Sequence, residues 1–147
     1  MPITIDLPDM NQQRLLLLRD GAERGRETLR HNLNAPHFPP VPELNVAAFG
    51  DKHLRTESEG WEAPDPQLVK AWFTQFQATF PDYASESKLA ALLGLQWKQG
   101  DRRIRAFKSG DAAVPYGIWR HFLVITGRVS QEIIPVLGIF DMNPDQE

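Results

Sequence analysis

The sequence predicts an all-α protein, a bundle of four to five helices with an N-terminal helical arm and a proline-rich connection. The clearest sign is one apolar stripe at the helical spacing i, i+4, i+7 and i+11, formed by Val69, Phe73, Phe76 and Phe80. A second sign is that short apolar stretches after it each end at a glycine, which commonly closes a helix. With 147 residues, of which 41% are hydrophobic, the chain can bury one core of respectable size.

The first helix is predicted from about Met10 to Asn32, because Asp9 can accept a hydrogen bond from its first turn as N-cap. Most of its apolar residues form one block, Leu15 to Leu18. Gly21 and Gly25 each weaken a helix by roughly 1 kcal/mol relative to alanine. A helix of this kind needs a partner surface, which is either the protein's own domain or a second copy of the chain.

An extended connection is predicted between this helix and the domain, since its prolines exclude long helices. The piece HFPPVPEL favours polyproline II, which suits either a stiff linker or a ligand for an aromatic groove. Four apolar residues are expected to hold the connection against the domain: Phe38, Val41, Leu44 and Phe49.

The compact domain is predicted to begin at Asp65, which can cap a helix with Pro66 at its first position, where a missing N–H is harmless. The apolar stripe lies on this helix, and Pro81 ends it. An aromatic stripe at this spacing favours core packing over a binding site.

A second helix is predicted from its N-cap Ser85 to Leu93, with Gly94 as the left-handed residue that closes it. Where two helices cross closely, the crossing residue must be small and the turn must admit a positive φ. Ala90 and Gly94 have these properties, so a helix-turn-helix is expected here.

The third helix is predicted from about Gln99 or Asp101 to Lys108, with Gly110 as its end. Ile104 and Phe107 supply its buried stripe. Its outer face then carries Gln99, Arg102, Arg103 and Ala106.

A fourth helix is predicted from Pro115 to Thr126, and Ser130 is expected to begin one more short helix through Leu137. The residues expected to be buried on the fourth helix are Ile118, Trp119, Phe122, Leu123 and Ile125. The chain is accordingly divided into a helical arm (1–33), a connection (34–64), a helix-turn-helix domain (65–140) and an acidic tail (141–147).

Positive charge is concentrated in the middle of the chain. Residues 85–131 contain 8 Lys/Arg and 3 Asp/Glu, whereas residues 1–84 contain 8 against 12 and residues 132–147 contain 0 against 4. A local excess of this kind is typical of a surface that faces phosphates, although the net charge of the whole chain is only −3.

From about residue 66 to 138, half of the chain, the sequence resembles the lambda-repressor-like, or XRE-type, helix-turn-helix family of bacterial and phage regulators. The resemblance is carried by LAALLGL in the second helix, by IRAFKSGDAAVP in the third helix and its loop, and by YGIWRHFLVITG followed by VSQEI. One departure is that Gly94 and Ile104 are ten positions apart, four more than is usual in the family. The insertion, within QWKQG, places Trp97 either as a lid on the core or as a projection toward DNA.

The resemblance implies that Asp101, Arg102 and Ala106 occupy the positions from which the third helix reaches base edges. Arg102 is the leading candidate, because a guanidinium can contact O6 and N7 of guanine together. Arg103 serves either a base or a phosphate. If the insertion rotates the helix, Gln99 and Arg103 take over base recognition.

Further residues are expected to contact the DNA backbone, which positions a protein without specifying sequence. Glu86 and Lys88 would lie where the second helix meets the groove edge, and Arg105 either faces solvent or pairs with an acidic neighbour. The expected backbone contacts come from Lys98, Lys108 and Ser109.

The sequence shows no pattern typical of an enzyme. Its four histidines lack metal-ligand spacing, there is no cysteine, and neither HExxH, GxSxG nor a phosphate-binding glycine loop occurs. We therefore expect no catalysis, metal or cofactor. With no run of about eighteen apolar residues and no secretory signal at the start, a cytoplasmic protein outside the membrane is expected.

These observations predict a sequence-specific transcriptional regulator of bacterial, phage or mobile-element type, which binds double-stranded DNA as a homodimer. The alternative is a non-enzymatic protein-binding adaptor, such as an antitoxin or a phage-type inhibitor, because a helix-turn-helix fold does not fix a function.

Overall fold

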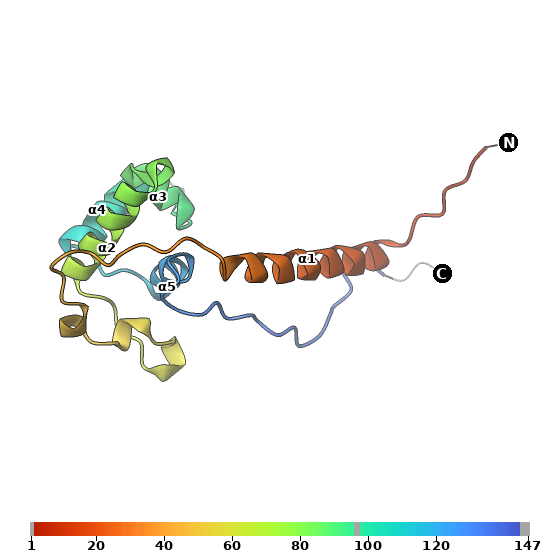
Figure 1. Ribbon diagram of the computed structural model, residues 1–147. Helices are drawn as coiled ribbons and strands as arrows, with labels where there is room; N and C mark the ends of the chain where they lie inside the picture. The colour runs from red at the N-terminus through yellow and green to blue at the C-terminus, as the bar shows by residue number, and fades with distance from the viewer. Residues whose placement is uncertain (1, 96–97, 145–147) are drawn as a thin grey trace. The chain divides into compact units, whose positions relative to one another are not determined.

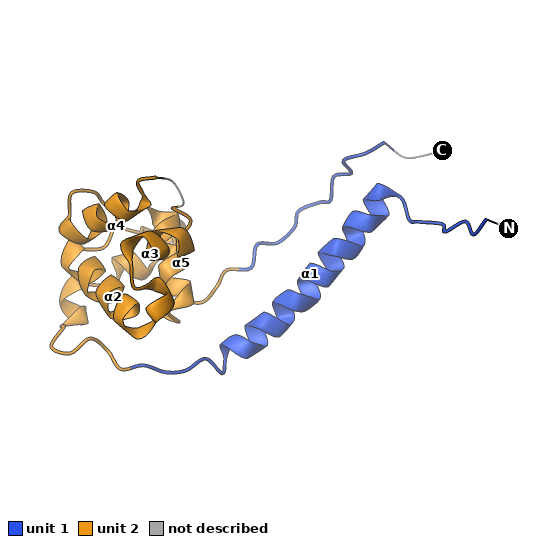
Figure 2. Ribbon diagram, turned by 90° about the horizontal axis from the view of Figure 1, so that it is seen from above, with its two compact units in different colours: residues 1–38, 133–147 blue, residues 39–132 orange. Residues whose placement is uncertain are grey.

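The computed structural model describes residues 2–95 and 98–144, and in these residues the protein is all-α, with five helices and no strand (Figure 1). The helices are α1 (Met10–Asn32), α2 (Pro66–Thr79), α3 (Glu86–Leu92), α4 (Gly100–Ser109) and α5 (Tyr116–Ile125). The chain forms two compact units, one of residues 39–132 and one of residues 1–38 with 133–147 (Figure 2). None of the described helices has the length and hydropathy of a membrane span.

The predicted N-caps are confirmed. The carboxylate of Asp9 accepts a hydrogen bond from Gln12 N, and that of Asp65 accepts one from Gln67 N, each at 2.8 Å. Ser85 Oγ accepts from Lys88 N at 3.2 Å. These bonds satisfy backbone donors that have no partner inside a helix, so the start of each helix is set by local sequence.

The core of the unit 39–132 takes buried side chains from α2, α3, α4 and α5, and aromatic side chains of α2 and α5 pack at its centre. Trp72 and Trp119 stack with an interplanar angle of 4° and ring centres 5.7 Å apart, and Phe73 meets Phe122 edge to face at 4.7 Å. Burial of each such side chain stabilises the fold by about 1.5–3 kcal/mol. The predicted stripe on α2 is thus confirmed as core, as is burial of Trp119 on α5.

Residues 39–64 are part of the compact unit rather than a free connection. The segment turns through three short 3-10 helices, at Val46–Phe49, Lys52–Leu54 and Glu57–Glu59. The predicted anchors Val41, Leu44 and Phe49 are partly buried against the core, whereas Phe38 lies in the other unit and is 54% exposed.

His53 fixes this segment to the bundle, and its side chain is only 3% exposed. The imidazole packs edge to face on Trp72 and Trp119, with ring centres 5.6 and 5.9 Å away. Trp119 Nε1 donates to His53 Nδ1 at 3.3 Å, and Trp61 Nε1 donates to the backbone oxygen of His53 at 3.1 Å. Because Nδ1 accepts a hydrogen bond, the buried ring is the neutral form with its proton on Nε2.

Two predictions for the C-terminal part of the domain were wrong. Ile125, expected in the core, is 40% exposed at the end of α5. No helix forms between Ser130 and Leu137, because Pro135 lacks an N–H and biases Ile134 toward extended backbone.

The environment of His53 makes stability depend on pH. Burial lowers the pKa of His53 below its ordinary value of 6.5; Arg128 acts in the same direction, whereas a Gly50 backbone hydrogen bond and Asp51 oppose it. Below pH 6.5 the unfolded chain binds a proton that the folded protein resists. The free energy of unfolding should therefore fall as pH drops through this range, by up to about 1.4 kcal/mol per pH unit.

Urea unfolding between pH 7.5 and 5 measures this effect, and His53→Phe is the matched variant because it keeps a ring but cannot titrate. We expect the pH slope above pH 5 to flatten in the variant. An equal slope in both proteins would assign the pH dependence to other groups.

Candidate nucleic-acid interface

The end of α3 is a tight glycine turn. Gly94 has a φ of +86°, its N–H donates to Ala91 O at 3.1 Å, and Leu95 N donates to Ala90 O at 2.7 Å. This pair of bonds is the Schellman arrangement, which satisfies carbonyls at a helix end and brings the buried Leu95 back onto the core. The predicted role of Gly94 as the left-handed stop is confirmed.

The crossing of α3 and α4 is formed by Ala90 and Gly100. A Cβ atom built on Gly100 would lie 2.9 Å from Ala90 Cβ and would also collide with the backbone oxygen of Leu95. Ala90, the small residue expected at the crossing, therefore faces a second small residue, Gly100. Gly94 instead forms the turn, where its positive φ is required. Glycine at position 100 lets α4 begin directly against α3.

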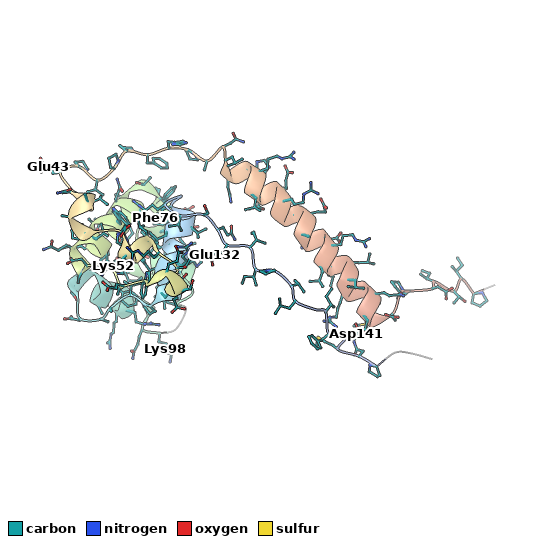
Figure 3. All side chains as sticks on the ribbon, turned by 90° about the horizontal axis from the view of Figure 1, so that it is seen from below. Glu43, Lys52, Phe76, Lys98, Glu132 and Asp141 are labelled. Carbon is teal, nitrogen blue, oxygen red and sulfur yellow. The ribbon has the colours of Figure 1, made fainter. Side chains whose placement is uncertain are left out.

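The predicted faces of α4 are present in the structure. Ile104 and Phe107 are buried, and Gln99, Arg102 and Arg103 are exposed on the other side. Ala106 is half-buried, so its side chain lies lower on this face than the arginines. Lys98 is exposed just before the helix (Figure 3). Trp97 and Gln96, within the insertion, lie outside the described residues.

Asp101 and Arg105 form an ion pair one turn apart on α4, with Arg105 Nη2 2.9 Å from Asp101 Oδ2. The hydrogen bond from Arg105 holds the pKa of the Asp101 carboxyl below its usual value. Of the two alternatives for Arg105, pairing is therefore the observed one. Asp101 is occupied by that pair, which reduces its capacity to contact a base.

Lys108 belongs to a polar network that joins three helices. Its ammonium group donates to Gln77 Oε1 at 2.6 Å and to Glu86 Oε1 at 2.9 Å, and Gln77 Nε2 donates to the same Glu86 oxygen at 2.8 Å. The Lys108 side chain is only 17% exposed. Lys108, expected to contact a phosphate, and Glu86, expected where the second helix meets the groove edge, are therefore paired with each other inside the bundle.

Ser109 closes α4 locally. Its hydroxyl donates to Ala106 O at 3.2 Å and accepts from Asp111 N at 3.4 Å, while Gly110 adopts a φ of +88°. The residue remains exposed at the surface.

The charge left unpaired on α3, the turn and α4 is entirely positive. The two carboxylates of this region, Glu86 and Asp101, are both held by cations of the bundle. Within the described part of the chain, no ion pair involves the remaining cations, which are Lys88, Lys98, Arg102 and Arg103. Arg103 stacks at 5.6 Å over the Phe107 ring, which supports its stem without neutralising it.

Three residues with a clear structural role were not identified from the sequence: Gly100, Gln77 and His53. Gly100 had a detectable signal, because a glycine beside the start of a helix is costly unless something approaches closely. Gln77 and His53 had none, since each takes its role from residues distant in sequence.

Comparison with protein-family models, with curated proteins and with solved structures finds no match to this chain. Its function is therefore inferred from the geometry and charge of its own residues.

The crossing at Gly100 is open to a direct test. Gly100→Ala should reduce the free energy of unfolding by about 1–3 kcal/mol, because the added methyl meets backbone that cannot move without displacing α3. The measurement is urea unfolding monitored by circular dichroism.

Gly117→Ala on α5 is the matched control, because a Cβ there would meet nothing within 4 Å. We expect it to be neutral or to stabilise by up to about 1 kcal/mol. Equal effects of the two variants would show that α3 and α4 do not cross closely at Gly100.

Proposed function

We propose that this protein is a sequence-specific DNA-binding regulator of bacterial, phage or mobile-element type, with α4 as its recognition helix. It is non-enzymatic and acts on double-stranded DNA as a homodimer. The observation that carries the proposal is the unpaired positive charge of α3 and α4, where both carboxylates, Glu86 and Asp101, are neutralised by ion pairs within the bundle. A surface of this kind attracts the phosphate backbone.

The arrangement of α3 and α4 supports a lambda-repressor-like helix-turn-helix. The two helices meet closely at Ala90 and Gly100, and α4 turns one apolar side to the core and one arginine-bearing side to solvent. A single exposed helix fits the major groove of B-DNA, which is about 12 Å wide. The first helix of such a pair crosses the backbone while the second enters the groove.

The exposed residues of α3, of α4 and of the turn between them are assigned two proposed roles, base recognition and phosphate contact. Arg102 has no ion-pair partner among the described residues, so its guanidinium is available for a bidentate contact with guanine. Arg103 and Gln99 share its side of the helix and are the alternative base contacts. Lys98 and Lys88 replace Lys108 as the phosphate contacts, and Ser109 remains a candidate for a hydrogen bond to a phosphate.

The class of partner is tested by a salt series. Binding of a duplex selected from a random pool should weaken linearly in log affinity against log salt, with a slope near 0.9 per neutralised phosphate. We expect a total slope of roughly 4 to 8 for a dimer that uses a few cations per copy. A folded protein that binds no duplex even at low salt would contradict the proposal and favour the protein-binding adaptor.

Base recognition and phosphate contact are separated by two single substitutions. Arg102→Ala should weaken the preferred site by about 1–3 kcal/mol and relax preference at one base position, because a bidentate contact discriminates between bases. Lys98→Ala should weaken all sequences about equally and lower the salt slope by about one unit.

Lys108→Met combined with Glu86→Gln is the matched control, since the two charges neutralise each other inside the bundle and are removed together. We expect it to lower stability while leaving base preference and salt slope unchanged. Unchanged preference in alanine variants of Arg102, Arg103 and Gln99 alike would show that α4 is not the recognition element.

A further inference from the structure

Helix α1 is long, and its apolar residues are exposed. None of its 23 residues is buried, and the leucines of its apolar block, Leu15 to Leu18, are between 45% and 66% exposed. Most helical stability in proteins comes from packing of an apolar face. Gly21 and Gly25 weaken this helix further. Such a helix needs a surface that covers its leucines.

The chain also carries an exposed apolar segment in the same compact unit. Residues 133–140 read IIPVLGIF, and their exposed large side chains are Ile133, Ile134, Val136, Leu137, Ile139 and Phe140. Leu137 is 99% exposed. Contiguous apolar surface of this extent on a soluble protein marks an interaction site. We call α1 and residues 133–144 together the arm.

Two polar contacts connect the halves of the arm within one chain. Asn11 Nδ2 donates to Asn143 O at 3.0 Å, and Arg14 Nη2 donates to Phe140 O at 3.2 Å. They tie the end of the segment to the first turns of α1. They leave the leucine block and the apolar segment exposed, so the contact inside one chain does not satisfy either surface.

The two halves have opposite charge. Helix α1 contains five arginines against three acidic residues, whereas residues 132–147 contain four acidic residues and no Lys or Arg. In the described part of the chain, Arg19, Arg24 and Arg30 take part in no ion pair, and neither does Asp141. The leucine block of α1, flanked by arginines, is thus complementary in charge to the apolar segment, which is followed by acidic residues.

We propose that the arm is a dimerisation element, in which the acidic apolar segment of each copy lies against the arginine-flanked leucines of α1 in the other. A two-fold axis makes this contact twice, because one chain supplies both complementary surfaces. The occupant is a second copy rather than a different protein, since the complement in apolarity and in charge is already encoded in the same chain. The inference deepens the proposed function by naming how its homodimer forms.

Paired charge reversals test the exchange between copies. In one variant, Arg14→Glu and Arg19→Glu make α1 acidic like the segment 133–147. In the other, Asp141→Lys and Asp145→Lys make that segment basic like α1. Each variant alone then brings like charges together, and its dimer dissociation constant should rise by roughly tenfold or more.

Mixing the two variants restores both opposite-charge contacts, but only if each segment lies against α1 of the other copy. Sedimentation velocity of the 147-residue chains, without DNA, should show the separate variants as monomers and the mixture as a heterodimer. Thr74→Glu with Ala78→Glu is the control, since it adds two acids on the exposed side of α2 and should leave dimerisation unchanged.

Three results would overturn the inference: a monomeric natural chain at tens of micromolar, variants that dimerise as well as the natural chain, or a mixture that stays monomeric. The test is separate from that of the proposed function, because it uses no DNA. A dimer that binds no duplex would overturn the proposed function alone, and a monomer that binds duplex would overturn the arm alone.

Discussion

Ala90 and Gly100 meet where α3 crosses α4, and one more carbon atom at position 100 would collide with the backbone of Leu95. This absence of space sets where α4 can begin and how it lies on α3. Because Ile104 and Phe107 then face the core, Arg102 and Arg103 are turned to solvent. The proposed recognition surface therefore depends on a close contact between two small residues, Ala90 and Gly100.

Around this crossing, the two carboxylates of α3 and α4 are neutralised by ion pairs with cations of the same bundle. Lys108 reaches Glu86 and Gln77, and Arg105 reaches Asp101. The partly buried Lys108–Glu86 pair connects α4 to α3, whereas the Arg105–Asp101 pair lies within α4 near the surface. Together they neutralise both carboxylates, so the unpaired charges of this surface are all positive. A chain with a net charge of −3 can in this way present one positive surface.

The features predictable from sequence are those that depend on neighbouring residues. Caps such as Asp65 and Ser85, the stripe on α2 and the stop at Gly94 follow from local chemistry. Lys108 could not be assigned, because its partner Gln77 lies 31 positions away and was not distinguishable from any surface glutamine. The burial of His53 within residues 39–64 likewise depends on Trp119, 66 positions further on.

Backbone-amide NMR of the 147-residue chain, titrated with a selected duplex, tests most directly whether α4 binds DNA as proposed. The account predicts the largest chemical-shift changes from Lys98 to Arg103 and at the start of α3, with small changes around His53 and along the exposed face of α5. Changes centred on α5 or on residues 39–64, or none at all with a folded protein, would contradict it.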